Sequence, residues 1–400
     1  MIIYLAIFLL FLIPVIRFDL MKMEGNKALW CGLEWIVLVL VAGLRYRVGG
    51  DTIVYMRLFE DYPTIGELSD FDFAKAKFFP GWYVFNSLFK TFGNSFTLFQ
   101  ISEAIIIQTC FFRFFRRYSP NGFFTCTLIF YFGYFCYFNM EVMREALCIC
   151  IFLEAYPFLE RRRFIPYFLL CSLALTIHLS AFIMFLLPLF TLFKKDRFWI
   201  WLALVLTIIF LLQVIDIATI LLQIAFSDSI AALARGYMAK MADRTLNGII
   251  IEVLTIVPFF IIVALRKHHG YTQNQEFGAL LTLFVMAQTA GITIPGVNRF
   301  SNYVLPLGVV FIVNTFYENY WQIRSRVFST LAIFATISIY CFNLSFFYLR
   351  SQHESLRGTH SWNRYVPYYS VVNPRMDTVR ETMMANERAF DPTINIQQQP

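Results

Sequence analysis

The sequence predicts an all-α polytopic membrane protein with about 12 transmembrane helices. Of its 400 residues, 58% are hydrophobic and 15% are charged, whereas soluble domains average roughly 45–50% and about 25%. The mean hydropathy is +0.61. The apolar residues gather in runs that match the thickness of a bilayer, and most Lys and Arg residues lie in short loops between these runs. The net charge of +7 therefore indicates orientation in a lipid bilayer and no nucleic-acid partner.

The apolar runs follow one another along the chain. The first run lacks a basic segment before it and a small-residue cleavage site after it, so we expect a retained helix and not a signal peptide. Two short runs, 164–177 and 180–193, leave open whether both cross the bilayer. The predicted spans are 1–16, 28–44, 96–114, 122–138, 142–159, 164–177, 180–193, 197–217, 248–266, 277–294, 299–317 and 327–347.

Six short loops contain sixteen basic residues, and they alternate with the other connections. Cytoplasmic loops are enriched in Lys and Arg, so these six are assigned to the cytoplasm and both termini to the outside. The basic residues are Arg17, Lys22, Lys27, Arg113, Arg116, Arg117, Arg161, Arg162, Arg163, Lys194, Lys195, Arg197, Arg266, Lys267, Arg324 and Arg326.

The first outer connection is long and has two parts. Residues 45–79 are polar, whereas 80–92 are apolar but too short to span, with Trp82, Phe85, Phe89 and Phe92 at helical spacing. This spacing predicts an amphipathic helix at the membrane interface. We expect a single transmembrane domain over 1–349. An extracytoplasmic tail over 350–400, ending in a Gln-rich run, is expected to be partly disordered.

Neither the cysteines nor the histidines predict a metal centre. The eight cysteines lie mostly inside apolar runs and lack the spacing of a zinc site or a disulfide framework. His268 and His269 lie beside basic residues in a predicted cytoplasmic loop, as solvated side chains do. The candidates for chemistry are therefore the charged groups at the outer ends of the spans, where ionisable residues are costly unless they have a function.

The first candidate cluster follows the second span. Arg45 and Arg47 precede Gly49-Gly50, a pair that permits a tight turn and close approach of a ligand, and Asp51 comes next. Tyr55 lies one helical turn later. Asp51 is interpreted either as the N-cap of a helix or as a carboxylate base, with a divalent cation as a further option. The two arginines are candidate ligands of a phosphate group.

The second cluster stands at the start of the span over 142–159. Arg144 is followed by Glu145, and Glu141 lies three residues before Arg144. One interpretation is an internal Glu141–Arg144 salt bridge that neutralises buried charge. The other is that Arg144 faces a cavity and binds an anion, with Glu145 beside it.

The third and fourth clusters are His178 with Ser180, and Arg299 with Tyr303. The pKa range of histidine suits proton transfer, although a lone His after an apolar helix is also a common structural group. Arg299 begins a span, where it either extends to the lipid headgroups or binds a ligand. Together the four clusters predict an outward polar cavity that suits a large anionic, lipid-linked substrate better than an ion or an apolar drug.

In this order, the clusters resemble the EpsG family of bacterial exopolysaccharide proteins, which are related to Wzy-type polysaccharide polymerases. The family pattern has an Arg, a Gly-x-Asp and a Tyr after the second span, an Arg-Gln stretch, a His-x-Ser and a late Arg with an aromatic residue. Glu145 stands where the family usually has Gln. The matching positions here are Arg47, Gly49, Gly50, Asp51, Tyr55, Arg144, His178, Ser180, Arg299 and Tyr303.

The resemblance implies a multi-pass protein of the bacterial inner membrane. It would join oligosaccharide repeat units carried on undecaprenyl diphosphate, at the periplasmic face, in exopolysaccharide, capsule or O-antigen synthesis. The implied architecture is that of lipid-linked GT-C glycosyltransferases, whose first outer loop also has an acidic residue and an interfacial helix. No cofactor is implied, and flippase and chain-length regulator proteins of the same pathway are the expected partners.

Two residues compete for the role of catalytic base, Asp51 and His178. We favour Asp51, because Arg47 nearby in sequence should keep it ionised, with His178 as a hydrogen-bonding partner of sugar or diphosphate. Two other functions are considered: a flippase of lipid-linked oligosaccharide, which would need charges at the bilayer midplane, and a polysaccharide acyltransferase.

Overall fold

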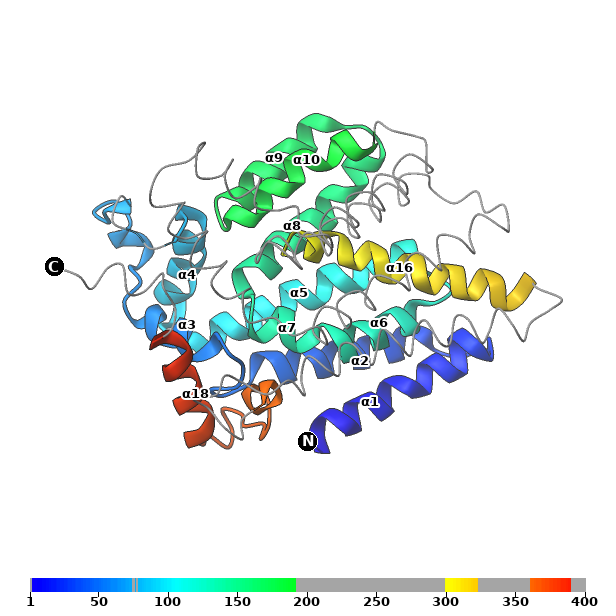
Figure 1. The fold of residues 1–400 in the computed structure, drawn as a ribbon, viewed down its shortest axis with the longest axis horizontal. Coiled ribbons are helices and arrows are strands. Elements are labelled where there is room, and N and C mark those ends of the chain that lie inside the picture. The colour runs from blue at the N-terminus through cyan, green and yellow to red at the C-terminus, as the bar shows by residue number, and fades with distance from the viewer. Residues whose placement is uncertain (1, 74–75, 77, 192–298, 323–359, 390–400) are drawn as a thin grey trace, which may run out of the picture. The chain divides into compact units, whose positions relative to one another are not determined.

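The computed structural model describes residues 2–73, 76, 78–191, 299–322 and 360–389. Every regular element in these ranges is a helix (Figure 1). The chain divides into two compact units, Met1–Leu186 with Phe347–Met384, and Leu187–Phe346 with Ala385–Pro400. The spans predicted at 197–217, 248–266, 277–294 and 327–347 lie outside the described residues.

The described helices follow the predicted spans closely. Two of them, Ile2–Leu20 and Phe96–Tyr118, are long and apolar enough to cross a membrane, and Phe123–Gly133, Phe164–Leu175 and Leu179–Leu189 are shorter apolar helices. The number of crossings therefore stays a prediction. The helices are α1 (Ile2–Pro14) with η1 (Val15–Leu20), α2 (Lys27–Gly43), α5 (Phe96–Tyr118), α6 (Phe123–Gly133), α7 (Phe135–Met140), α8 (Met143–Glu160), α9 (Phe164–Leu175), η4 (Leu179–Ala181), α10 (Phe182–Thr191) and, in the second unit, α16 (Arg299–Gln322).

Three predicted cytoplasmic loops meet at one end of the first unit. The Lys22 ammonium donates to the carbonyl of Asn121 at 3.3 Å, and the Tyr118 hydroxyl donates to Glu160 at 3.0 Å. Their connections thus bring the basic residues near 17–27, 113–117 and 161–163 together. The other three basic loops lie outside the described residues.

The helices α2 and α5 pack in opposite directions. Trp35 Nε1 donates to Thr109 Oγ1 at 3.2 Å, and a Cβ placed on Gly43 would lie 2.8 Å from the Cα of Ile101. Position 43 of one helix therefore faces position 101 of the other, while position 35 faces 109. Gly43 permits this close approach where α2 ends, so the loop that follows starts beside the first turns of α5.

The connection between α2 and α5 contains α3 (Thr52–Glu60), η2 (Ile65–Glu67) and α4 (Pro80–Gly93). The α4 helix coincides with the predicted amphipathic segment, and three of its four predicted aromatic residues pack on protein. Trp82, Phe85 and Phe89 pack on Phe99 of α5, with ring centroids 5.6, 5.7 and 5.8 Å apart. The exposed apolar side chains of α4 are Val84, Leu88 and Phe92, the fourth of the predicted aromatic residues.

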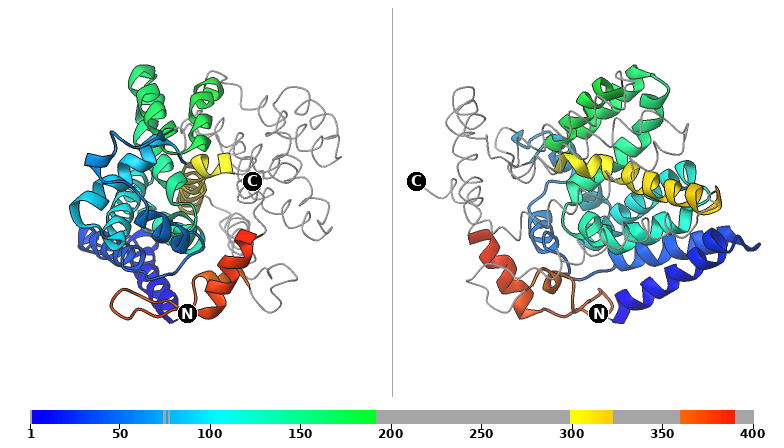
Figure 2. Two further views of the ribbon diagram at one scale, coloured as in Figure 1. Left: turned by 90° about the vertical axis from the view of Figure 1, so that its left-hand side faces the viewer. Right: turned by 45° about the vertical axis from the view of Figure 1, so that its right-hand side comes forward.

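Part of the C-terminal tail is folded onto the first unit. It contains η6 (Ser361–Arg364) and α18 (Thr378–Ala389), drawn in orange and red in Figures 1 and 2. The amide of Tyr46 donates to the carbonyl of Tyr369, and the amide of Val371 donates to that of Leu44, both at 2.9 Å. These bonds fasten the tail, up to Met384 within this unit, along the loop that follows α2.

Candidate functional site

Arg45 follows the end of α2 and links this helix to its neighbours through buried contacts. Its side chain is 1% exposed, Nε donates to Thr52 Oγ1 at 3.2 Å, and the guanidinium also donates to the carbonyl of Ala42 and contacts the sulfur of Met143. Burial lowers the pKa of Arg45. The arginine remains charged, because its usual pKa is far above neutral. Its buried side chain therefore joins α2, α3 and α8 through contacts with Ala42, Thr52 and Met143.

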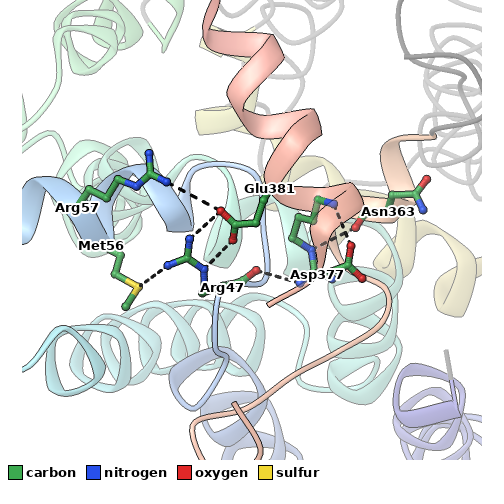
Figure 3. A network of polar contacts seen from close by, with 7 residues as sticks. Arg47, Met56, Arg57, Asn363, Asp377 and Glu381 are labelled. Carbon is green, nitrogen blue, oxygen red and sulfur yellow. Dashed lines mark hydrogen bonds and ion pairs between the residues drawn. The ribbon is translucent and has the colours of Figure 1, made fainter. Parts of the chain in front are cut away.

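Arg47 is engaged by the tail. Its Nε and one terminal nitrogen donate to the two carboxylate oxygens of Glu381 at 2.6 and 2.7 Å, a two-pronged ion pair seen in Figure 3. The hydrogen bond to Glu381 raises the pKa of Arg47. Arg57 lies 4.0 Å from the same carboxylate and is 62% exposed. A group that the sequence assigns to the substrate thus has a carboxylate of its own chain as partner.

Arg380 locks the same loop through its backbone. Its buried guanidinium donates to the carbonyls of Arg47, Asn363 and Pro367 at 2.9, 3.2 and 2.6 Å. Arg47 has a φ of +53°. An unusual backbone angle of this kind persists only where surrounding contacts hold it. Arg380 and Glu381 could not be predicted as part of the site, because nothing in their local sequence points to a loop more than 300 residues earlier.

The Gly49-Gly50 turn packs against the chain itself. The Gly50 amide donates to one carboxylate oxygen of Glu141 at 2.7 Å, and the Arg364 guanidinium donates to the other at 2.9 Å. Gly49 has a φ of +105°, and a Cβ there would lie 2.6 Å from that of Met140. The interpretation of Glu141 as the partner of Arg144 is therefore wrong, because the turn and the tail supply its partners.

Asp51 stands directly before α3 and is half-buried. Asp51 is the N-cap residue of α3, as one interpretation of the sequence expected, but its side chain makes no capping hydrogen bond to the helix. Tyr55, one turn later, is 5% exposed. Burial raises the pKa of Tyr55 to about 12, with Arg144 lowering it and the charge of Asp51 raising it. The three groups therefore belong to one electrostatic neighbourhood.

Arg144 lies in the first turn of α8 and is half-buried. Its Nε donates to the Tyr55 hydroxyl at 2.9 Å, and its guanidinium carbon lies 4.0 Å from the ring centroid of Phe78 and 5.9 Å from that of Tyr55. Among the described residues, no carboxylate lies within 4.0 Å of this guanidinium. Arg144 is thus a cation held on aromatic rings. Glu145, the next residue, is buried.

His178 ends the connection between α9 and η4. The Ser180 amide donates to Nδ1 at 3.1 Å, and Ser180 Oγ lies 2.7 Å from Nδ1. A backbone amide can only donate, so Nδ1 is the acceptor and Nε2 carries the proton of the neutral ring. The Gly81 amide donates to the Thr176 carbonyl at 2.8 Å. This bond joins the connection before His178 to the start of α4, close in sequence to Phe78, whose ring contacts Arg144.

The described first unit thus brings the Asp51, Arg144 and His178 clusters to the end opposite the three basic loops. Arg299 begins α16 of the second unit, with Tyr303 in its second turn. These two residues are not among those that the first unit assembles. Among the described residues, no group of three or more His, Cys, Asp or Glu side chains could hold a metal ion. A divalent cation at Asp51 stays a prediction.

Comparison with known protein families identifies the family of this chain. Neither the curated proteins nor the solved structures contain a significant match to this chain. The model of the EpsG family matches residues 28–370, a range that contains all four sequence clusters and the tail residue Arg364. Membership agrees with the apolar helices of a membrane protein and suggests a polymerase-type role in exopolysaccharide synthesis. Because the match covers most of its length, this chain belongs to the EpsG family.

Proposed function

We propose that this protein is a glycosyltransferase of the bacterial inner membrane that polymerises oligosaccharide repeat units carried on undecaprenyl diphosphate. The reaction takes place at the periplasmic face, in exopolysaccharide, capsule or O-antigen synthesis. The observation that carries the proposal is Arg144, a half-buried guanidinium on aromatic rings with no carboxylate within ion-pair distance among the described residues. Such a group suits an anionic leaving group held at the mouth of an apolar helix bundle.

Arg144 is prepared for a diphosphate in two ways. Its Nε is used by Tyr55, and the described residues supply no acceptor to its two terminal nitrogens, which form the fork that matches phosphate oxygens. Tyr55 has its pKa raised to about 12 by burial, so its hydroxyl stays neutral near pH 7 and does not cancel the charge of Arg144. Attraction to the guanidinium grows as negative charge develops on the departing diphosphate.

The proposed step is a direct displacement. An acceptor hydroxyl oxygen attacks the anomeric carbon of the donor, and Asp51 takes the hydroxyl proton. The bond from that carbon to the diphosphate oxygen breaks, and undecaprenyl diphosphate leaves with the electron pair. One attack inverts the anomeric centre without a covalent enzyme intermediate. General base help of this kind contributes roughly 10²–10⁴-fold.

The remaining candidate residues take supporting roles in the proposal. His178 accepts from Ser180 through Nδ1, which supports a role as hydrogen-bond donor to sugar or diphosphate through Nε2. Arg45 and Arg47 shape the loop that carries Asp51, and Glu145 and Ser180 complete the wall around Arg144 and His178. From the second unit, we propose that Arg299 and Tyr303 bind the lipid-linked substrate. A flippase would deliver that substrate, and a chain-length regulator would limit the product.

The test is the fate of lipid-linked repeat units in a deletion strain. Single units should accumulate in the outer leaflet, and wild-type protein should restore the polymer while an equally abundant Arg144→Ala variant should not. Accumulation in the inner leaflet would contradict a polymerase and indicate a flippase. Normal chain length with altered decoration would contradict it as well and indicate an acyltransferase.

A further inference from the structure

The first unit contains a cavity of about 760 Å³ beside α3, and the proposed chemistry does not use it. Its walls are the loop after α2, the outer face of α3, the end of α4, the start of α5 and the tail near 371–374. The volume falls within the range of roughly 300–1,000 Å³ that small-molecule sites occupy. It exceeds the space that a single sugar ring needs.

The α3 helix separates this cavity from Arg144. Thr52, Met56 and Phe59 recur at helical spacing and line the cavity, whereas Tyr55 points to the adjacent face and meets Arg144. Asp51 directly precedes Thr52 in the chain. The α3 helix therefore borders the cavity on one face and contacts Arg144 through Tyr55 on the next face. The proposed base, Asp51, lies at the start of this helix.

The cavity lining combines flat apolar rings with neutral hydrogen-bonding groups. The half-buried ring of Phe96 lies 5.7 Å from the buried ring of Phe59, measured between centroids, so Phe96 is the ring that a ligand can contact. Asn94, Ser95, Thr97 and the acidic residue Glu60 also line the cavity. A sugar ring presents C–H groups on its faces and hydroxyls at its edge. It can therefore stack on an aromatic ring while its hydroxyls bond to amide and hydroxyl side chains. The lining has the composition that such a ligand requires.

The cations of the cavity already have partners. Arg47 is paired with Glu381, and the Lys90 ammonium donates to the carbonyls of Phe59 and Glu60 at 3.1 and 2.7 Å, where α3 ends. Lys90 thereby compensates the negative end of the helix dipole. Because Arg47 and Lys90 already have partners, the cavity differs from the surroundings of Arg144. It favours a neutral polyhydroxyl ligand over a free anion.

We infer that this cavity is the subsite for the glycan of the acceptor, holding the sugar residues next to the attacking hydroxyl, on the face of α3 adjacent to the one that carries Tyr55 and borders the donor diphosphate. The inference rests on the proposed polymerase function, whose donor site is at Arg144. It names the acceptor side of the same reaction.

The test uses two soluble probes on the purified full chain in detergent. The first is a lipid-free oligosaccharide from partial acid hydrolysis of the strain's own polysaccharide, and the second is inorganic pyrophosphate. Thr97→Trp places an indole in the cavity mouth, whereas Leu98→Trp places it on the exposed side of the same helix turn, outside the cavity lining. Phe96→Leu removes a stacking ring with little change of bulk. Each variant is first checked for a single elution peak and an unchanged melting temperature.

We expect Thr97→Trp and Phe96→Leu to weaken oligosaccharide binding by about tenfold or more, while Leu98→Trp stays near wild type. Pyrophosphate binding should be lost in Arg144→Ala and kept in the two cavity variants and in the Leu98→Trp control. Oligosaccharide binding that is absent from wild type, unchanged in the folded cavity variants or equally weakened by Leu98→Trp would overturn the subsite. If the wild-type protein binds the oligosaccharide but does not bind pyrophosphate, the result would instead count against the donor site of the proposed function.

Discussion

Glu381 and Arg47, 334 residues apart in the chain, form a two-pronged ion pair with bonds of 2.6 and 2.7 Å. Both side chains are largely buried, at 20% and 13% exposure. The pair joins the tail to the loop that carries Asp51, and Arg380 adds three bonds to backbone carbonyls at the same place. The tail is thus part of the wall of the candidate site.

Removing this ion pair should destabilise the protein more than removing its exposed neighbour. Arg47→Gln should lower the free energy of unfolding by about 1–3 kcal/mol, because it removes two charge-assisted hydrogen bonds. Arg57→Gln acts on the same carboxylate from 4.0 Å and high exposure, so its effect should be about 0–1 kcal/mol. Thermal unfolding of the purified full chain measures both. Equal shifts in the two variants would show that the pair does not hold the tail.

Gly50→Ala should disturb the turn before Asp51. A Cβ at this position would overlap the carboxylate of Glu141, which bonds the Gly50 amide and Arg364. Displacing Glu141 should lower stability by roughly 1–3 kcal/mol and reduce polymer formation. Gly66→Ala, in the same outer connection, meets open space and is the matched control. Polymer chain length and melting temperature that match between the two variants would contradict the importance of the turn.

We expect both Arg144→Ala and Arg144→Lys to lower the polymerisation rate. Arg144→Ala removes the proposed contact with the departing diphosphate and should lower the polymerisation rate by about 10²–10³-fold. Arg144→Lys should rescue poorly, since an ammonium cannot bond Tyr55 and present a planar fork at once. The rate is measured with lipid-linked repeat units at saturating concentration. Full rescue by Lys would reduce the role of Arg144 to that of a point charge.

His178 offers a pair of replacements that separate its two nitrogens. Asn keeps an acceptor near the position of Nδ1, which the Ser180 amide needs, whereas Gln keeps a donor near the position of Nε2. If Nε2 donates to the substrate, His178→Gln should retain partial polymerisation and His178→Asn should retain less. The reverse order, measured at equal protein level, would assign His178 to the local turn alone.

Much of the helical architecture could be predicted from the sequence, because apolar runs of membrane depth carry a strong signal. The alternation of basic loops also predicted that Asp51, Arg144 and His178 share one end. Contacts within the first unit agree, since Arg144 bonds Tyr55 and Gly81 bonds Thr176. These contacts do not test the prediction for Arg299, because Arg299 lies in the second unit.

The partners of single side chains could not be predicted. Glu141 lies one turn before Arg144, yet Gly50 and Arg364 satisfy it, because a buried carboxylate gains more from two fixed donors than from one flexible neighbour. Trp82, Phe85 and Phe89 of α4 pack on Phe99, whereas Phe92, which has the same helical spacing, is exposed. Periodicity reveals that a helix has an apolar face, but it does not say whether protein or membrane covers that face.

The role of Asp51 as the base is decided by polymerisation with purified Asp51→Asn in the presence of lipid-linked repeat units. Asn preserves the size of the side chain but cannot take the acceptor proton at neutral pH. We predict that this variant, folded and with wild-type affinity for pyrophosphate, leaves the repeat units as single lipid-linked units. Full-length polymer from Asp51→Asn at the wild-type rate would remove Asp51 from the reaction and move the base to His178.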